Sequence, residues 1–221
     1  METFAILGRM KSLSLSRPLV IMVVGLPGSG KSFFARQFAD TFSAPVVSYD
    51  KLRSTIFPDP TFSRGEDAVL QDIADYEINE LLKTHKTFIV DGGVNTRIER
   101  VAIERQARAH DYHTLIVWVQ TDEPTSHMRA TKRSSKRKTD EWNVSITDEL
   151  FKLQVKRLNA PLRTEQQVVV SGKHTYATQA KVVLKKLVSP REDEVQTVHP
   201  PERNLNNDDQ TSAHRRSITI N

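Results

Sequence analysis

An α/β fold of three layers, with a five-stranded parallel sheet between two layers of helices, is predicted for this chain from two observations. From Leu19 onward, short runs rich in Val and Ile alternate with longer amphipathic stretches, which is the pattern of strand-helix-strand units. The apolar runs are continuous and do not alternate with polar residues, as expected of strands covered on both faces. The 221 residues, of which 38% are apolar, suffice for one such domain with a short appendage.

Five strands and six helices are expected along the chain. The predicted strands are residues 19–24, 45–48, 87–90, 114–119 and 167–170. The predicted helices are residues 31–42, 64–84, 97–109, 123–132, 147–158 and 178–188. Apolar residues recur at helical spacing in the longest helix, and Ser63 with Glu66 has the pattern of a capping box at its start. The last helix carries one apolar stripe that is predicted to pack on the sheet, formed by Ala180, Val183, Leu184 and Leu187.

The composition narrows the classes of protein. The chain has no cysteine, which excludes disulfides, zinc-thiolate sites, cysteine-held iron-sulfur clusters and thiol catalysis, and favours a cytoplasmic location. Its longest apolar run, residues 19–24, is far shorter than the roughly 20 residues of a membrane-spanning helix, so no membrane partner is expected. Residues 1–17 are expected to be a lead-in to the domain, without the pattern of a secretory signal.

The last segment, residues 189–221, differs in composition from the rest. It has three prolines, no Phe, Tyr or Trp, and four Arg against six Asp and Glu. Such a segment buries too little apolar surface to order itself, so we predict a disordered tail after a domain that spans residues 18–188. Because the whole chain has a net charge of +5, the excess of positive charge lies before the tail, where it suits an anionic ligand.

The strongest motif joins the first predicted strand to the first predicted helix. It matches the Walker A pattern G-x-x-x-x-G-K-S and consists of Gly25, Leu26, Pro27, Gly28, Ser29, Gly30, Lys31 and Ser32. Glycines let the backbone N–H groups converge on phosphate oxygens without Cβ clashes, and the helix N-terminus adds partial positive charge. Lys31 is then expected to reach the β and γ phosphates, and the Ser32 hydroxyl to ligate Mg²⁺. The alternative is a glycine-rich turn that precedes a helix.

The second strand leads into Asp50 and Arg53 at the carboxyl edge of the sheet, where α/β proteins bind ligands. A carboxylate there can accept the proton of an attacking hydroxyl, and an arginine one turn later can hold an anionic or polar acceptor. The alternative fits the sequence equally well: Asp50 caps the start of a helix, and Arg53 lies on the surface without a functional role.

The third strand ends at Asp91, a position at which a carboxylate supports Mg²⁺ or its water shell. Gly92 and Gly93 follow, so a simple turn is the alternative. Asn95 and Arg97 come next and carry a weaker signal for contact with the acceptor.

A basic segment, residues 129–138, holds six cations in ten residues and suggests a lid. An arginine that closes over a migrating phosphoryl group stabilises its charge, and Arg129 and Arg133, four residues apart, are the candidates. A solvated basic loop is the alternative for the rest of the segment.

These segments resemble the P-loop kinases of the polynucleotide kinase and zeta-toxin type, which include small AAA-domain ATP-binding proteins. The resemblance covers residues 19–187 and rests on GLPGSGKS, SYDKLR, IVDGGVNTR and the two lid arginines. It implies a P-loop NTPase three-layer sandwich with strand order 2-3-1-4-5 and a helical lid, ATP with Mg²⁺ as donor, and activation of a hydroxyl by Asp50. Relatives commonly place Asn or Thr within three residues of the third-strand Asp, whereas Asn95 is the fourth residue after Asp91.

We therefore predict a Mg²⁺-dependent phosphotransferase that moves the γ-phosphate of ATP to a hydroxyl of a small-molecule or nucleic-acid acceptor. One alternative is a nucleotide-dependent switch or ATPase without a phosphorylated product. The chain lacks the Asn-Lys-x-Asp segment of GTPases, and Gly92 stands where a typical AAA+ motor has Glu. A second alternative is a nucleic-acid-binding module that uses the basic segment.

Overall fold

The structure is a computed structural model, and it describes residues 17–132 and 145–188. Arg133 and the rest of the basic segment up to Lys138 lie outside these residues, as do the predicted tail and residues 1–16. The elements in chain order are β1 (Leu19–Val24), α2 (Lys31–Phe42), β2 (Val46–Ser48), α3 (Tyr49–Ile56), α4 (Arg64–Leu82), β3 (Phe88–Asp91), α5 (Arg97–Ala109), β4 (His113–Gln120), α6 (Glu123–Thr131), α7 (Asp148–Arg157), β5 (Gln167–Ser171) and α8 (Tyr176–Val188).

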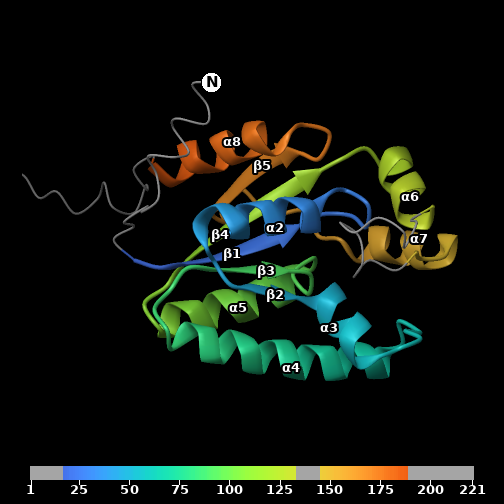
Figure 1. Cartoon of the computed structure of the whole chain (residues 1–221), viewed down its shortest axis with the longest axis horizontal. Coiled ribbons are helices and arrows are strands. Elements are labelled where there is room, and N and C mark those ends of the chain that lie inside the picture. The colour runs from blue at the N-terminus through green and yellow to red at the C-terminus, as the bar shows by residue number, and fades with distance from the viewer. Residues whose placement is uncertain (1–16, 133–144, 189–221) are drawn as a thin grey trace, which may run out of the picture. The chain divides into compact units, whose positions relative to one another are not determined.

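In the described residues, the strands form one five-stranded parallel sheet of order β2-β3-β1-β4-β5, which confirms the predicted fold class. Figure 1 shows helices α2 and α8 on one face of the sheet and α4 and α5 on the other. The parallel strands end at one edge, so the loops that follow β1, β2, β3 and β4 meet there.

Strand β1 lies at the centre of the sheet, and all six of its residues are buried. Its side chains alternate between two cores, as the pleat requires. Leu19, Ile21 and Val23 join the core with Phe34 and Phe38 of α2. The opposite set joins the core that includes α4 and α5, and consists of Val20, Met22 and Val24 packed with Ala74, Ile78, Ile103 and Ala107. The position of the loop after β1 is therefore fixed from both faces of the sheet.

Three details differ from the sequence-based expectations. Helix α3 is absent from the predicted helices, because it has only eight residues and begins directly after β2, although Tyr49 and Leu52 pack partly buried on the core. Ser63 caps α4 as predicted, but the Glu66 carboxylate turns away from the cap and accepts hydrogen bonds from the Thr61 and Phe62 N–H groups. The expectation that every strand is covered on both faces is wrong for β5, an edge strand on which Val169 is 45% exposed.

Within the described residues, no helix combines the length and the apolar character needed to cross a membrane.

Candidate active site

The loop between β1 and α2 adopts backbone conformations that only glycine accommodates easily. Gly28 and Gly30 have φ angles of 78° and 103°, and Gly30 is the N-cap of α2. A Cβ at Gly28 would overlap with the carbonyl oxygen of Ser126 on α6. Glycine is therefore needed in this loop for two reasons: the backbone has positive φ angles, and helix α6 approaches it closely. Both are expected of the predicted phosphate-binding loop.

Three polar contacts hold this loop in place. The Gly25 N–H donates to Asn95 Oδ1 at 3.2 Å, and the Thr121 hydroxyl donates to the Ser29 carbonyl at 2.9 Å. Lys31 Nζ donates to the Leu26 carbonyl at 3.1 Å, within the loop itself. The sequence did not predict the first two contacts, because their partners are 70 and 92 residues apart.

A cleft of about 630 Å³ opens at the carboxyl edge of the sheet beside the loop. It brings together nine of the predicted site residues, which are Pro27, Gly28, Gly30, Lys31, Ser32, Asp50, Arg53, Asp91 and Arg129. Gly25, Leu26 and Ser29 belong to the loop without being part of the lining that the described residues form. Figure 1 shows α6 and α7 beyond the end of the sheet toward which the strand arrows point.

Asp91 ends β3 and is only 4% exposed at the base of this cleft. Burial, reinforced by the charge of Asp50, raises its pKa to about 6, against the opposing effects of Lys31, a hydrogen bond with Ser32, and Arg36. Its Oδ1 is buried without a hydrogen-bond partner among the described residues. An orphaned carboxylate oxygen beside a serine hydroxyl is a donor set that suits Mg²⁺.

A cation at this point would need most of its ligands from elsewhere. No group of three or more His, Asp or Glu with metal-binding geometry occurs in the described part of the chain. Mg²⁺ in nucleotide sites is commonly held by one or two protein groups, substrate phosphates and water. Ser32 and Asp91 therefore fit such an ion only in combination with a bound nucleotide.

Asp50 and Tyr49 come from the first turn of α3, which begins directly after β2. Ser48 caps this turn by accepting a hydrogen bond from the Lys51 N–H. The Tyr49 ring packs directly on the backbone of Gly92 and Gly93, whose φ angles are 97° and 64°. The two glycines therefore do more than form a turn, because they leave room for the ring beside the cleft.

Arg53 lies in the cleft lining with its guanidinium already bound. It forms ion pairs with Glu66 at 2.8 Å and Asp67 at 2.5 Å, and its Cζ lies 4.6 Å from the centre of the Phe62 ring. The predicted contact of Arg53 with an acceptor stays a prediction.

Arg129 lies on α6 and also lines the cleft. Its Nη1 donates to the Gly172 carbonyl at 3.3 Å, in the loop after β5. A Cβ at Gly172 would overlap with the Ser29 carbonyl, so this second loop directly contacts the loop between β1 and α2, which we call the phosphate loop. Asn95 lines the cleft, whereas Arg97 is exposed and outside the described lining.

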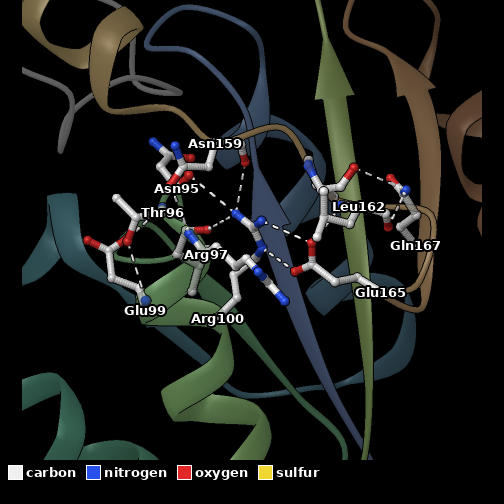
Figure 2. A network of polar contacts seen from close by, with 11 residues as sticks. Asn95, Thr96, Arg97, Glu99, Arg100, Asn159, Leu162, Glu165 and Gln167 are labelled. Atoms are coloured by element: carbon white, nitrogen blue, oxygen red, sulfur yellow. Dashed lines mark hydrogen bonds and ion pairs between the residues drawn. The ribbon is translucent and has the colours of Figure 1, made fainter.

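Arg100, a buried arginine that the sequence did not identify as a site residue, holds the backbone around Asn95 in place. Arg100 of α5 is 1% exposed and forms a two-point ion pair with Glu165, with distances of 2.7 and 3.1 Å. Its Nη1 donates to the carbonyls of Val94, Asn95 and Asn159. Figure 2 shows how these contacts surround Asn95, whose side chain holds Gly25. The phosphate loop is thereby linked to the segment before β5.

The parallel sheet, the glycine-rich loop between β1 and α2, and the acidic residues opposite it define a P-loop nucleotide-binding fold of the kinase type. The chain belongs to the AAA domain family, whose profile matches residues 20–161. No curated protein matches the sequence.

Solved structures with the same fold include kinases. A gluconokinase from Sinorhizobium meliloti aligns with a TM-score of 0.57 and 18% identity over 83% of this chain and 98% of that one. The APS kinase of Mycobacterium tuberculosis, in complex with AMPPNP and APS, aligns with a TM-score of 0.57 and 18% identity over 78% and 99%. Kti12 of Chaetomium thermophilum, with ADP-AlF3, aligns with a TM-score of 0.57 and 17% identity over 76% and 96%.

Proposed function

We propose that this protein is an ATP-dependent phosphotransferase that acts on a hydroxyl acceptor. The observation that carries the proposal is one cleft in which Lys31 and Ser32 of the phosphate loop lie together with Asp50 and Asp91. Lys31 and Ser32 supply the donor side, and the carboxylates supply the groups that a proton transfer and a metal ion need. The gluconokinase and the APS kinase have the same fold, and the structures of the APS kinase and Kti12 contain AMPPNP and ADP-AlF3. Both findings support the binding of ATP.

In the proposed reaction, the hydroxyl oxygen of the acceptor forms a bond to the γ-phosphorus while the bond to the β,γ-bridging oxygen of ATP breaks. Asp50 accepts the proton of the hydroxyl, and ADP leaves. Lys31 stabilises the negative charge that spreads over the transferred group, and Arg129 assists from α6, together with Arg133 of the basic segment. Mg²⁺, held through Ser32 and Asp91, supplies further neutralisation of the phosphates when it is bound. A location in the cytoplasm fits a chain without cysteine.

The experiment that tests this proposal separates binding from transfer in the Asp50→Asn variant. The amide keeps the shape of the side chain but does not accept the proton. We expect the affinity for ATP, measured by calorimetry, to stay within about threefold, because Asp50 does not belong to the phosphate loop. Transfer of labelled γ-phosphate to an acceptor from a panel of sugars, nucleosides, aminoglycosides and 5′-hydroxyl RNA should fall by roughly 10² to 10⁴. Loss of ATP binding with normal transfer from bound ATP would assign Asp50 to the donor site instead.

A further inference from the structure

One wall of the cleft consists of alternating charges, which we call the ion-pair wall. Arg53 of α3 pairs with Glu66 and Asp67 of α4 at 2.8 and 2.5 Å. Arg157 of α7 pairs with the other carboxylate oxygen of Asp67 at 3.6 Å and with Glu99 of α5 at 3.7 Å. Four of these five residues line the cleft, and Glu66 lies behind Arg53. The wall thus has three carboxylates for two guanidinium groups.

Arg53 is committed to carboxylates, whereas Arg157 is 45% exposed and lies 3.6 and 3.7 Å from Asp67 and Glu99. The side chains of Arg53 and Glu66 are only 12% and 10% exposed, and Phe62 covers the guanidinium carbon at 4.6 Å. An anionic acceptor that recruited Arg53 would leave the buried carboxylate of Glu66 without its ion-pair partner, and with the hydrogen bonds from Thr61 and Phe62 alone. Breaking a buried ion pair in this way is strongly unfavourable. An anion at this wall would also lie beside Asp67 and Glu99, which repel it.

The remaining positive charge in the described lining belongs to the donor side. Lys31 and Arg36 lie near Asp91, since their charges lower its pKa. Arg129 donates to the loop that touches the phosphate loop, and Lys132 follows α6. These cations lie on the donor side, so the acceptor side holds the two arginines and three carboxylates of the ion-pair wall together with Asp50, and carries an excess of negative charge.

The rest of the acceptor side offers neutral hydrogen-bonding groups and apolar surface. Gln71 lines the cleft, accepting from the Tyr49 hydroxyl at 3.2 Å and donating to Asp75 at 3.1 Å. Gln154 and Leu70 also line the cleft. Hydroxyl groups both donate and accept, so a ring with several hydroxyls can satisfy guanidinium, carboxylate and amide groups in turn.

We infer that the acceptor is a polyhydroxyl compound without a negative charge, such as a sugar or the ribose of a nucleoside, that binds against the ion-pair wall. This inference rests on the proposed function. Of the anionic and polar acceptors that the sequence leaves open for Arg53, it favours the polar ones, because Arg53 is already paired with Glu66 and Asp67.

The test compares acceptors that share their hydroxyls and differ in charge. With the full chain, labelled ATP and Mg²⁺, we would measure kcat/KM for an aldohexose and its aldonic acid, and for adenosine and its 3′-monophosphate. We expect the neutral member of the active pair to exceed its anionic counterpart by about tenfold or more. Preference for the acid or the 3′-phosphate would overturn the inference while the proposed function stands. If no acceptor gains label while ATP is turned over, both are overturned.

A variant links the preference to the wall. Asp67→Asn deprives both arginines of a carboxylate, so the ratio of the rate for the anionic acceptor to that for the neutral one should rise by about tenfold. Glu99→Gln should shift the ratio in the same direction through Arg157 alone, and serves if the first variant does not fold. Asp72→Asn, exposed on the same helix and outside the lining, is the matched control. An unchanged ratio in both folded wall variants would contradict the role of the wall.

Discussion

Lys31 is the side chain on which the proposed chemistry depends most directly. Lys31→Ala should reduce ATP turnover by at least about 10²-fold, because it removes a positive charge aimed at the transferred phosphate. Lys156→Ala, on the exposed face of α7 and outside the described lining, is the control with an identical change in charge. Steady-state ADP release measures both variants. Turnover by Lys31→Ala above about a tenth of the wild-type rate would contradict the assignment.

Gly93 provides a second test at single-residue scale. Gly93→Ala should lower the free energy of unfolding by roughly 1–3 kcal/mol, because the position combines a φ of 64° with direct contact of the Tyr49 ring. Gly65→Ala is the control, since Gly65 lies in the exposed first turn of α4 and its nearest neighbour to an added Cβ, Ser63 Oγ, is 3.9 Å away. The control should be neutral or slightly stabilising. Equal stability of the two variants in urea would show that Tyr49 does not need the glycine.

The sequence predicts those site residues whose role depends on local backbone chemistry. The phosphate loop can be recognised in the sequence because its glycines, lysine and serine lie in one continuous motif. Asp91 can be recognised because it directly ends an apolar strand. Arg53 was assigned to the acceptor, but its partners Glu66 and Asp67 become neighbours only when α3 and α4 pack together. No local pattern reports such a pairing.

At the scale of elements, the buried pair of Arg100 and Glu165 joins α5 to the segment before β5. Glu165→Ala should lower the free energy of unfolding at pH 7 by roughly 3–5 kcal/mol, because it leaves a buried guanidinium without its counterion. The control is Glu104→Ala, which breaks the exposed pair with Arg108 and should cost about 0–1 kcal/mol. Similar losses in the free energy of unfolding of the two variants, measured in urea, would show that the buried pair contributes no more to stability than the exposed pair.

The same pair predicts a dependence on pH. Burial raises the pKa of Glu165, but hydrogen bonds from Arg100 and the Leu162 N–H, together with the charge of Arg100, outweigh burial and leave the pKa lowered. A carboxyl with a lowered pKa in the folded state stabilises the fold above its ordinary pKa and loses this effect as the pH falls through the lowered value. The difference in stability between the wild type and Glu165→Ala should therefore shrink in acid. A difference that grows below pH 4.5 would contradict this sign.

The elements themselves were predictable to the extent that burial leaves a periodic pattern. Strand β1 and helix α2 have the predicted bounds, since both are packed in the core. Helix α3, which carries Asp50 and Arg53, was missed because it has only eight residues and follows β2 without a loop, although Tyr49 and Leu52 pack partly buried on the core. The contact of Asn95 with Gly25 likewise depends on the positions of β1 and β3 in the finished sheet.

At the scale of the whole molecule, residues 18–188 are predicted to carry catalysis. A truncation that ends at Pro190 should keep its melting temperature and its rate of phosphoryl transfer, because the removed segment supplies no predicted site residue and has no Phe, Tyr or Trp. The apolar stripe of α8, with Ala180 and Val183 buried, remains to cover the sheet. Loss of either property on truncation would place part of the site or the core in the segment after Pro190.

The measurement that tests the central claim most directly is the stoichiometry of the reaction with γ-labelled ATP, Mg²⁺ and the acceptor panel. A phosphotransferase forms one phosphorylated acceptor for each ADP, and little inorganic phosphate. We predict this ratio for at least one acceptor, with loss of product formation in Lys31→Ala and Asp50→Asn. Release of inorganic phosphate equal to ADP, at a rate that no acceptor changes, would contradict the claim and identify a nucleotide-dependent switch or ATPase.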